Sequence, residues 1–348
     1  MQGIQGHRLR SEIDEQPAAL ARLLGRRGEV VSAARRIRAF RPDWVCIAAR
    51  GTSDNAARYA QYLLGAHNGL GVGLAVPSLF TVYGAPPRLG RALTIGISQS
   101  GKSPDVVSVV EEARQQGGAT LAITNDPSSP LAAAAEAVIA LDVGVERSIA
   151  ATKTYTAELL ALAMLSAAIE SDPQRWEVLE HVPEWVSAAL AGAGDLAGAA
   201  AMRDSDRFLV VGRGFNYCTA FEIALKMKET GYVLAEPYSP PDLLHGPVAM
   251  IESGFPVVLV APSGRASGDT VALLDLLAQR RARVVALSDR SEVLERAQLP
   301  VPLPRNVPEW VSPIVSVVPG QLFASALAVA RGFDPDAPRG LSKVTLTH

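Results

Sequence analysis

The chain has 348 residues, of which 48% are hydrophobic and 20% charged, and its formal net charge is −2 at pH 7. Since a domain usually takes roughly 100–200 residues, this length favours two domains with sizeable cores, and the near-neutral charge argues against a nucleic-acid partner. The polar N-terminus and the lack of an uninterrupted apolar run of about 18 residues argue against secretion and against a membrane span, so we expect a cytoplasmic protein.

The first half of the chain alternates predicted helices with predicted strands. Residues 8–40 carry apolar side chains at helical spacing. Five short apolar runs are typical of strands, and they occupy residues 43–49, 71–76, 93–97, 119–124 and 137–141. The loop at residues 50–55 precedes a helix, and a long helix is predicted over residues 148–166. Strands separated by helices predict a parallel sheet with helices on both faces.

The second half repeats the landmarks of the first half at a nearly constant distance along the chain. Arg213-Gly214 follows a predicted strand as Arg50-Gly51 does, and Ser263-Gly264 corresponds to Ser100-Gly101 at the same spacing. A third pair of landmarks keeps almost the same spacing. We therefore predict a duplicated α/β domain, with the first domain at residues 1–190 and the second at residues 191–348.

A polar loop follows the third predicted strand. Its polar side chains include Ser98, Gln99, Ser100 and Ser103. Ser103 is placed to cap the next helix, and Pro104 would then occupy the first helical position. Hydroxyl groups and backbone N–H groups at a helix N-terminus are suited to bind one phosphate group. The alternative is an ordinary polar connection between a strand and a helix.

Lysine is rare in this chain. Only five lysines occur among the 33 basic residues Lys plus Arg, and they are Lys102, Lys153, Lys226, Lys228 and Lys343. A coding bias toward arginine, with five lysines retained by chance, would explain this. The alternative is that some of these positions need a primary amine, which arginine cannot supply.

A second cluster of polar residues lies on a helix predicted in the second half. Glu222, Lys226 and Glu229 have the spacing i, i+4 and i+7, so they share one helical face. His245 follows in a loop with several prolines and a glycine, which would hold it in place. A carboxylate, an amine and an imidazole together suit proton transfer beside a carbonyl group, although a surface ion-pair ladder has the same pattern.

The sequence resembles the sugar isomerase (SIS) domain family, in particular the isomerase half of glucosamine-6-phosphate synthase and the SIS-type glucosamine-6-phosphate deaminases. The resemblance covers essentially the whole chain. It is carried by EIDEQP at 12–17, RGTSDNA at 50–56, ISQSGKSPD at 97–105, SIAATKTY at 148–155, GRGFNYCTAFEIALKMKE at 212–229, LLHGP at 243–247, SPIVSVVPGQL at 312–322 and PRGLSKVT at 338–345. It implies two tandem SIS domains, each a five-stranded parallel sheet flanked by helices.

The resemblance also implies roles for single residues. Those that match substrate-binding positions are Thr52, Ser53, Ser98, Gln99, Ser100, Ser103, Ala151, Lys226 and Ser342. Glu229 matches the acid/base that moves a proton between C1 and C2, and His245 matches a ring-opening histidine that comes from a neighbouring subunit. Lys343 matches the synthase lysine that forms a Schiff base.

The sequence differs from the synthase pattern at three places. Leu244 stands where the synthase has a lysine, and Ala151 stands where it has a serine. The tail has one residue fewer after Lys343. Whether Lys343 forms a Schiff base therefore stays open.

The expected function follows from what the sequence lacks. It offers no counterpart of the glutaminase domain that supplies ammonia in the synthase, so we expect the deaminating direction, from glucosamine 6-phosphate to fructose 6-phosphate and ammonia. The expected partners are a phosphorylated amino sugar and a second copy of the chain in a homodimer with shared sites. The alternatives are a fructosamine-6-phosphate deglycase and a sugar-phosphate sensor without turnover. The sugar configuration, gluco or galacto, stays open.

The two cysteines lie at the edges of predicted buried elements. Cys46 and Cys218 have no metal-ligand spacing. We expect both to be reduced core residues, and we expect no metal and no cofactor.

Overall fold

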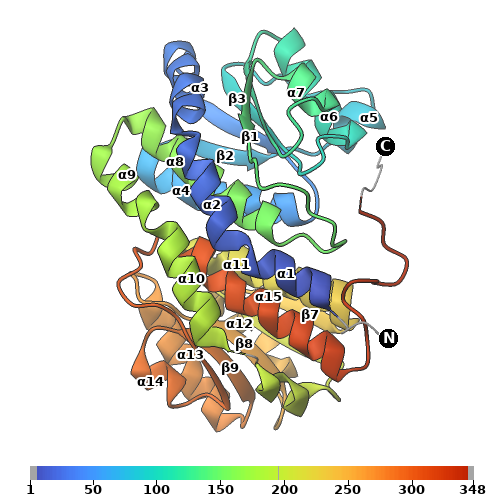
Figure 1. Ribbon diagram of the computed structural model, residues 1–348, viewed down its shortest axis with the longest axis vertical. Coiled ribbons are helices and arrows are strands. Elements are labelled where there is room, and N and C mark those ends of the chain that lie inside the picture. The colour runs from blue at the N-terminus through green and yellow to red at the C-terminus, as the bar shows by residue number, and fades with distance from the viewer. Residues whose placement is uncertain (1–5, 195, 344–348) are drawn as a thin grey trace. The chain divides into compact units, whose positions relative to one another are not determined.

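The computed structural model describes residues 6–194 and 196–343 and contains two five-stranded parallel sheets (Figure 1). The first sheet has the strand order β2-β1-β3-β4-β5. Its strands are β1 (Trp44–Ala48), β2 (Gly71–Leu74), β3 (Ala92–Ile97), β4 (Ala119–Thr124) and β5 (Ala137–Ala140). All pairs in it are parallel, and β3 is buried along its whole length. This confirms the predicted strands of the first half.

The second sheet has the strand order β10-β9-β8-β6-β7. Its strands are β6 (Arg207–Val211), β7 (Leu234–Tyr238), β8 (Pro256–Val260), β9 (Arg283–Ser288) and β10 (Leu299–Pro302). Taken from β7, this is the same order as that of the first sheet, and all its pairs are parallel. The predicted duplication of a five-stranded α/β domain is therefore confirmed.

Helices cover both sheets (Figure 1). Those that precede β6 are α1 (His7–Asp14), α2 (Gln16–Gly25), α3 (Arg27–Phe40), α4 (Thr52–Asn68), α5 (Ser78–Thr81), α6 (Pro104–Gln115), α7 (Pro130–Ala134), α8 (Lys153–Glu170), α9 (Pro173–Glu180), α10 (Val182–Ala193) and η1 (Ala197–Met202). Those that follow β6 are η2 (Gly214–Asn216), α11 (Tyr217–Gly231), α12 (Pro240–Leu244), η3 (Pro247–Met250), α13 (Ser267–Gln279), α14 (Ser291–Leu294) and α15 (Ser312–Ala330). Around the first sheet, α3 and α4 pack on α8, whereas α6 packs on α7.

The described chain forms two compact units, and neither is one continuous segment. The first-sheet unit contains residues 18–146, 153–181 and 342–343. The second-sheet unit contains residues 6–17, 147–152 and 182–341. The boundary at 190/191 concerns the order of the two repeats along the chain, and it stays a prediction.

Two helices begin at residues other than those predicted. Helix α4 begins at Thr52, directly after Gly51 with its φ of 55°, so the expected loop at residues 50–55 is shorter. Helix α8 begins at Lys153 and not at residue 148. Residues 148–152 stay outside the helix because carboxylates take the local backbone N–H groups: Glu12 accepts from the N–H of Ser148.

Helix α15 is the most apolar long helix among the described residues. Its length and a mean hydropathy of 1.7 would suffice to cross a membrane, but 83% of that window is buried inside the protein. It packs on α11, and Gly320 makes this close approach feasible because a Cβ there would lie 2.3 Å from Cδ1 of Ile223. Helix α15 therefore serves as a core helix that supports α11.

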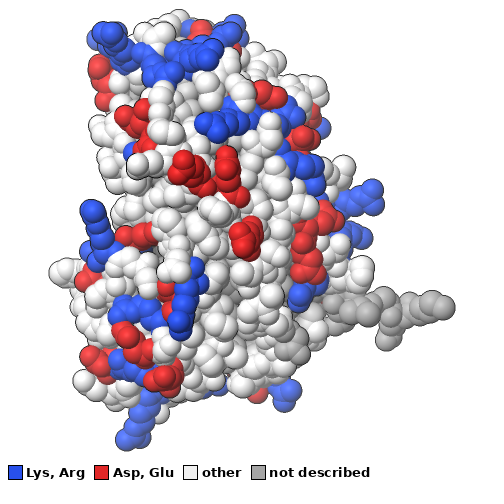
Figure 2. Space-filling model, turned by 60° about the vertical axis from the view of Figure 1, so that its left-hand side comes forward, with Lys and Arg blue, Asp and Glu red and all other residues white. Residues whose placement is uncertain are grey.

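Acidic and basic side chains are interspersed on the face drawn in Figure 2. This mixture agrees with the formal net charge of −2. Both cysteines are buried and free, which confirms their prediction as reduced core residues. Burial raises the pKa of the Cys46 thiol to about 11, so the neutral thiol is the stable form there.

Candidate functional site

The loop between β3 and α6 is a tight turn held by its own hydroxyl groups. Ser98 is buried, and its Oγ accepts a hydrogen bond from the backbone N–H of Gly101 at 3.1 Å. Gly101 has a φ of 62°, and a Cβ there would lie 2.1 Å from Oγ of Ser129. Only glycine fits this position without displacing its neighbours. Ser100 and Gln99 are half-buried in the same turn.

Ser103 occupies the N-cap position of α6, as predicted, but its side chain makes no cap hydrogen bond. Its backbone carbonyl instead accepts from the N–H groups of Val106 and Val107, at 3.1 Å each. The predicted N-cap position of Ser103 and the start of the helix at Pro104 are therefore confirmed, and the extended backbone at Ser103 begins the helix without a hydrogen bond from its hydroxyl. This hydroxyl makes no such bond within the described chain, so it can serve a ligand at the helix N-terminus.

An ion pair fixes the start of α6 to the end of β1. The Arg50 Nε lies 2.6 Å from Oδ2 of Asp105, whose side chain is only 1% exposed, whereas that of Arg50 is 51% exposed. Sequence reasoning did not select Arg50. The signal that would have found it is the repeat itself, because Arg213 and Asp269 form the corresponding pair at 2.8 Å in the second-sheet unit.

Thr52 and Ser53 lie in the first turn of α4, at the same edge of the sheet. Ser53 is buried and donates a hydrogen bond to Oε1 of Glu158 on α8 at 2.8 Å. Its hydroxyl thus holds α4 against α8, while Thr52 is half-buried. The substrate-binding role of both residues stays a prediction.

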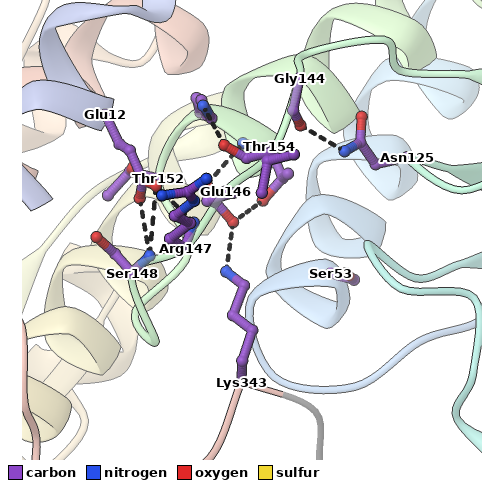
Figure 3. Close-up of polar contacts among 12 residues, drawn as sticks. Glu12, Ser53, Asn125, Gly144, Glu146, Arg147, Ser148, Thr152, Thr154 and Lys343 are labelled. Atoms are coloured by element: carbon purple, nitrogen blue, oxygen red, sulfur yellow. Dashed lines mark hydrogen bonds and ion pairs between the residues drawn. The ribbon is translucent and has the colours of Figure 1, made fainter. Parts of the chain in front are cut away.

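Lys343 returns to the first-sheet unit from the far end of the sequence (Figure 3). Its Nζ lies 2.7 Å from Oε2 of Glu146, whose side chain is fully buried. The same Oε2 accepts from the Thr154 hydroxyl at 2.7 Å, and Oε1 accepts from the Thr154 N–H at 3.1 Å. Lys153 beside it is buried and donates to the Val145 carbonyl at 2.8 Å. The structure thus places two of the five lysines around one short segment.

Two further predicted site residues, Ser342 and Ala151, are more exposed to solvent than Glu146. Ser342 is exposed, next to Lys343. Ala151 is half-buried in the segment 147–152, which belongs to the second-sheet unit.

Helix α11 of the second-sheet unit carries the predicted acid/base cluster. The Lys226 Nζ lies 3.3 Å from Oε1 of Glu222 and 2.6 Å from Oε2 of Glu229. Lys226 and Glu222 are buried, whereas the side chain of Glu229 is 24% exposed. Burial works to lower the pKa of Lys226, but the charges of both carboxylates and their hydrogen bonds outweigh it and raise that pKa. The cluster is therefore a buried ammonium between two carboxylates, and not a surface ladder.

His245 lies in the same unit, at the C-terminal end of α12. Ser239 caps this short helix at its N-terminus by accepting from the Asp242 N–H. The His245 side chain is exposed, and no hydrogen bond joins it to the cluster on α11 within the described chain. Leu244 beside it is 54% exposed, where the synthase pattern has a lysine. Within the described chain, His245 thus forms no hydrogen bond or ion pair with Glu229.

The described residues contain no group of three or more His, Cys, Asp or Glu side chains that could hold a metal ion. The arrangement offers two chemical functions on separate units. The first-sheet unit presents a hydroxyl-rich turn suited to a phosphate group, and the second-sheet unit presents a partly exposed carboxylate beside a buried ammonium.

Comparisons with known proteins agree with this architecture. The chain is 35% identical over 342 residues to the glutamine–fructose-6-phosphate aminotransferase (isomerizing) of Methanothermobacter thermautotrophicus, a match that covers 97% of this chain and 57% of that protein. The chain thus spans just over half the length of this curated relative.

Two solved structures are similar over nearly the whole chain. A Silicibacter pomeroyi protein assigned as a phosphosugar isomerase is 36% identical with a TM-score of 0.86, and the match covers 96% of this chain and 100% of that chain. The C-terminal domain of the glucosamine-fructose-6-phosphate aminotransferase from Francisella tularensis is 25% identical with a TM-score of 0.83, with 97% and 100% covered. The SIS domain model matches residues 41–168 and 201–331, so the chain belongs to the SIS domain family, with one match in each of its two repeats.

Proposed function

We propose that this protein isomerises a phosphorylated amino sugar and releases its nitrogen as ammonia, converting glucosamine 6-phosphate and water into fructose 6-phosphate and ammonia. The observation that carries the proposal is the cluster on α11, in which a 24% exposed carboxylate lies 2.6 Å from a buried ammonium. A carboxylate that is exposed enough to meet a substrate and is oriented by a buried cation suits a general base.

The reaction divides into steps that these side chains can serve. The sugar ring opens, with His245 assisting, and exposes an aldehyde at C1 that acidifies the proton on C2. Glu229 takes that proton and returns it to C1, while a proton from the nitrogen on C2 is transferred, in net terms, to the C1 oxygen. The product is a C1 alcohol with an imine at C2. Water then adds to the imine carbon, and ammonia leaves.

The phosphate group would be held by the turn after β3. The Ser100 and Ser103 hydroxyls and the N-terminus of α6 offer hydrogen-bond donors, and Arg50 adds a positive charge nearby. The similarity to a protein assigned as a phosphosugar isomerase supports a phosphorylated sugar as the substrate class.

The nitrogen source decides the direction of the reaction that we propose. The curated relative is named glutamine–fructose-6-phosphate aminotransferase (isomerizing). Both cysteines of this chain are buried, so neither is placed to attack glutamine. The side chains described above can serve a substrate that already carries its nitrogen, and we propose the direction in which this nitrogen is lost. We further propose that two copies of the chain share each site, because His245 is exposed and no hydrogen bond joins it to Glu229 within the described chain.

The test is a panel of glucosamine 6-phosphate, galactosamine 6-phosphate and a fructosyl amine 6-phosphate, with release of ammonia or amine as the readout. We expect ammonia from an amino-sugar phosphate and none from the unphosphorylated sugar. Amine release from the fructosyl compound alone would replace the proposal with a deglycase. Binding of these compounds without any turnover would replace it with a sensor.

A further inference from the structure

Glu146 is a fully buried carboxylate that no local sequence pattern explains. It lies six residues after β5 and just before the chain leaves the first-sheet unit. Its two oxygens accept hydrogen bonds from Thr154 and from Lys343, among other contacts. A buried carboxylate without partners is costly, so these contacts favour the observed position of Lys343.

Asn125 ties the Glu146 segment to the turn after β3. The Asn125 N–H donates to the Gln99 carbonyl at 3.1 Å. Its side chain accepts from the Val143 N–H at 3.1 Å and donates to the Gly144 carbonyl at 2.8 Å (Figure 3). Hydrogen bonds thus link the predicted phosphate-binding turn through Asn125 to residues 143 and 144. The backbone leads from there to Glu146, which holds Lys343.

We infer that Glu146 is a positioning residue, which holds the Lys343 ammonium at a fixed place relative to the phosphate-binding turn. The inference rests on the proposed function for the statement that Lys343 meets the substrate. The side chain of Lys343 is 25% exposed, so part of it can be reached from solvent while Glu146 holds the ammonium. The Nζ of Lys343 donates to Oε2 of Glu146 at 2.7 Å.

This arrangement gives Lys343 a role that needs no covalent adduct. The ammonium donates a hydrogen bond to an oxygen of the opened sugar, whose phosphate the turn after β3 fixes at the other end. A substrate that is held at both ends has fewer conformations available, so it loses less entropy when it reaches the reactive geometry. Glu146 also accepts two hydrogen bonds from Thr154, but we infer that its effect on catalysis passes through Lys343 and must disappear when Lys343 is absent.

The first experiment does not depend on turnover. The chain has five lysines, and Lys102 and Lys228 are exposed, so they serve as internal references in amine labelling followed by mass spectrometry. In the unaltered protein we expect Lys343 to be labelled more slowly than both references. In Glu146→Gln its rate should rise toward theirs. An unchanged ratio of Lys343 to Lys228 would overturn the inference, whether or not the protein proves to be a deaminase.

The second experiment is a double-mutant cycle on kcat. We expect Glu146→Gln to lower kcat by about 10- to 100-fold in the unaltered background and to change it by less than about twofold in the Lys343→Met background. Equal losses in both backgrounds would show a merely structural role for Glu146 and would overturn the inference.

Thr154→Val is the matched control, since it removes the hydroxyl that donates to Oε2 of Glu146 but leaves the ion pair with Lys343. It should keep most of the activity and the slow labelling of Lys343. If Glu146→Gln does not fold, Glu146→Asp keeps the charge and withdraws it from Lys343, and the same two readouts apply. Altered labelling in a protein that turns over no amino-sugar phosphate would refute the proposed function and leave the inference standing.

Discussion

The turns after β3 and β8 occupy equivalent places in the two repeats, yet they are built for different purposes. Both lie beside an arginine–aspartate pair, Arg50 with Asp105 in one and Arg213 with Asp269 in the other. In the second turn, however, Glu309 accepts hydrogen bonds from two backbone N–H groups, those of residues 265 and 266, at 2.9 and 3.2 Å. Both repeats thus have the same turn and ion pair, but in the second repeat the side chain of Glu309 occupies the turn.

The space around Glu309 confirms that this turn is closed. A Cβ at Gly264 would lie 2.4 Å from the Glu309 carboxyl carbon, so this carboxylate packs directly on the turn. The cavity that remains there measures about 10 Å³, which is close to the minimum for one water. Glu309 thus takes the backbone N–H groups of this turn that an anion would otherwise use.

The helices that follow β1 and β6 also differ, but here it is the second repeat that carries the polar groups suited to function. Helix α11 carries Glu222, Lys226 and Glu229, whereas the equivalent positions of the first repeat, on α4, hold Tyr59, Leu63 and Ala66. One repeat thus keeps the turn suited to a phosphate, and the other keeps the groups suited to proton transfer. Each prediction below tests this division between the repeats.

The largest effect should come from removing the base. Glu229→Gln should lower kcat by about 10²–10⁴-fold, because proton transfer at C2 loses its carboxylate. The measurement is exchange of the C2 proton with deuterium from solvent, followed by NMR. Lys228→Gln is the matched control, since Lys228 is exposed on the same helix. Exchange at the wild-type rate in the glutamine variant would show that the base lies elsewhere.

The next effect should come from the turn after β3, which we propose to bind the phosphate group. Ser100→Ala with Ser103→Ala should raise KM for the phosphorylated sugar, because each hydrogen bond to a charged group contributes about 1.5–3 kcal/mol. A similar loss of two hydroxyl groups at the closed turn, Ser263→Ala with Ser267→Ala, should leave KM unchanged. If the two double variants shifted KM equally, the division between the repeats would be wrong.

A shared site predicts recovery of activity when two inactive variants are mixed. Chains with His245→Ala and chains with Glu229→Gln should each be inactive alone. In a random mixture of two-fold dimers, half of the dimers are mixed and one of their two sites is intact, so recovery should reach about a quarter of wild-type activity. Subunit exchange is verified by native mass spectrometry, and no recovery after exchange would place the whole site in one chain.

Much of the fold, and part of the site, could be predicted because these features depend on local patterns. The strands follow from short apolar runs, and the three residues of the cluster on α11 follow from helical spacing. The buried carboxylates Glu12, Glu146 and Glu158 could not be predicted. Their partners are backbone N–H groups, a serine 105 residues away and a lysine 197 residues away, and no sequence period links such positions.

Glu309 could not be predicted either, because its partners are backbone N–H groups 44 and 43 residues away. A substitution of Glu309 tests the comparison of the two turns directly, with the smallest expected effect. Glu309→Ala leaves two backbone N–H groups of the second turn without their carboxylate, and water can replace it only in part. We expect a loss of about 1–2 kcal/mol in the free energy of unfolding, measured by urea denaturation. Glu309→Gln keeps an acceptor oxygen and should lose less. In the first repeat we expect the backbone N–H groups of the turn after β3 to bind the ligand. Addition of a phosphorylated sugar should therefore raise the free energy of unfolding. A Glu309→Ala variant as stable as the unaltered protein would show that the carboxylate does not hold the second turn closed.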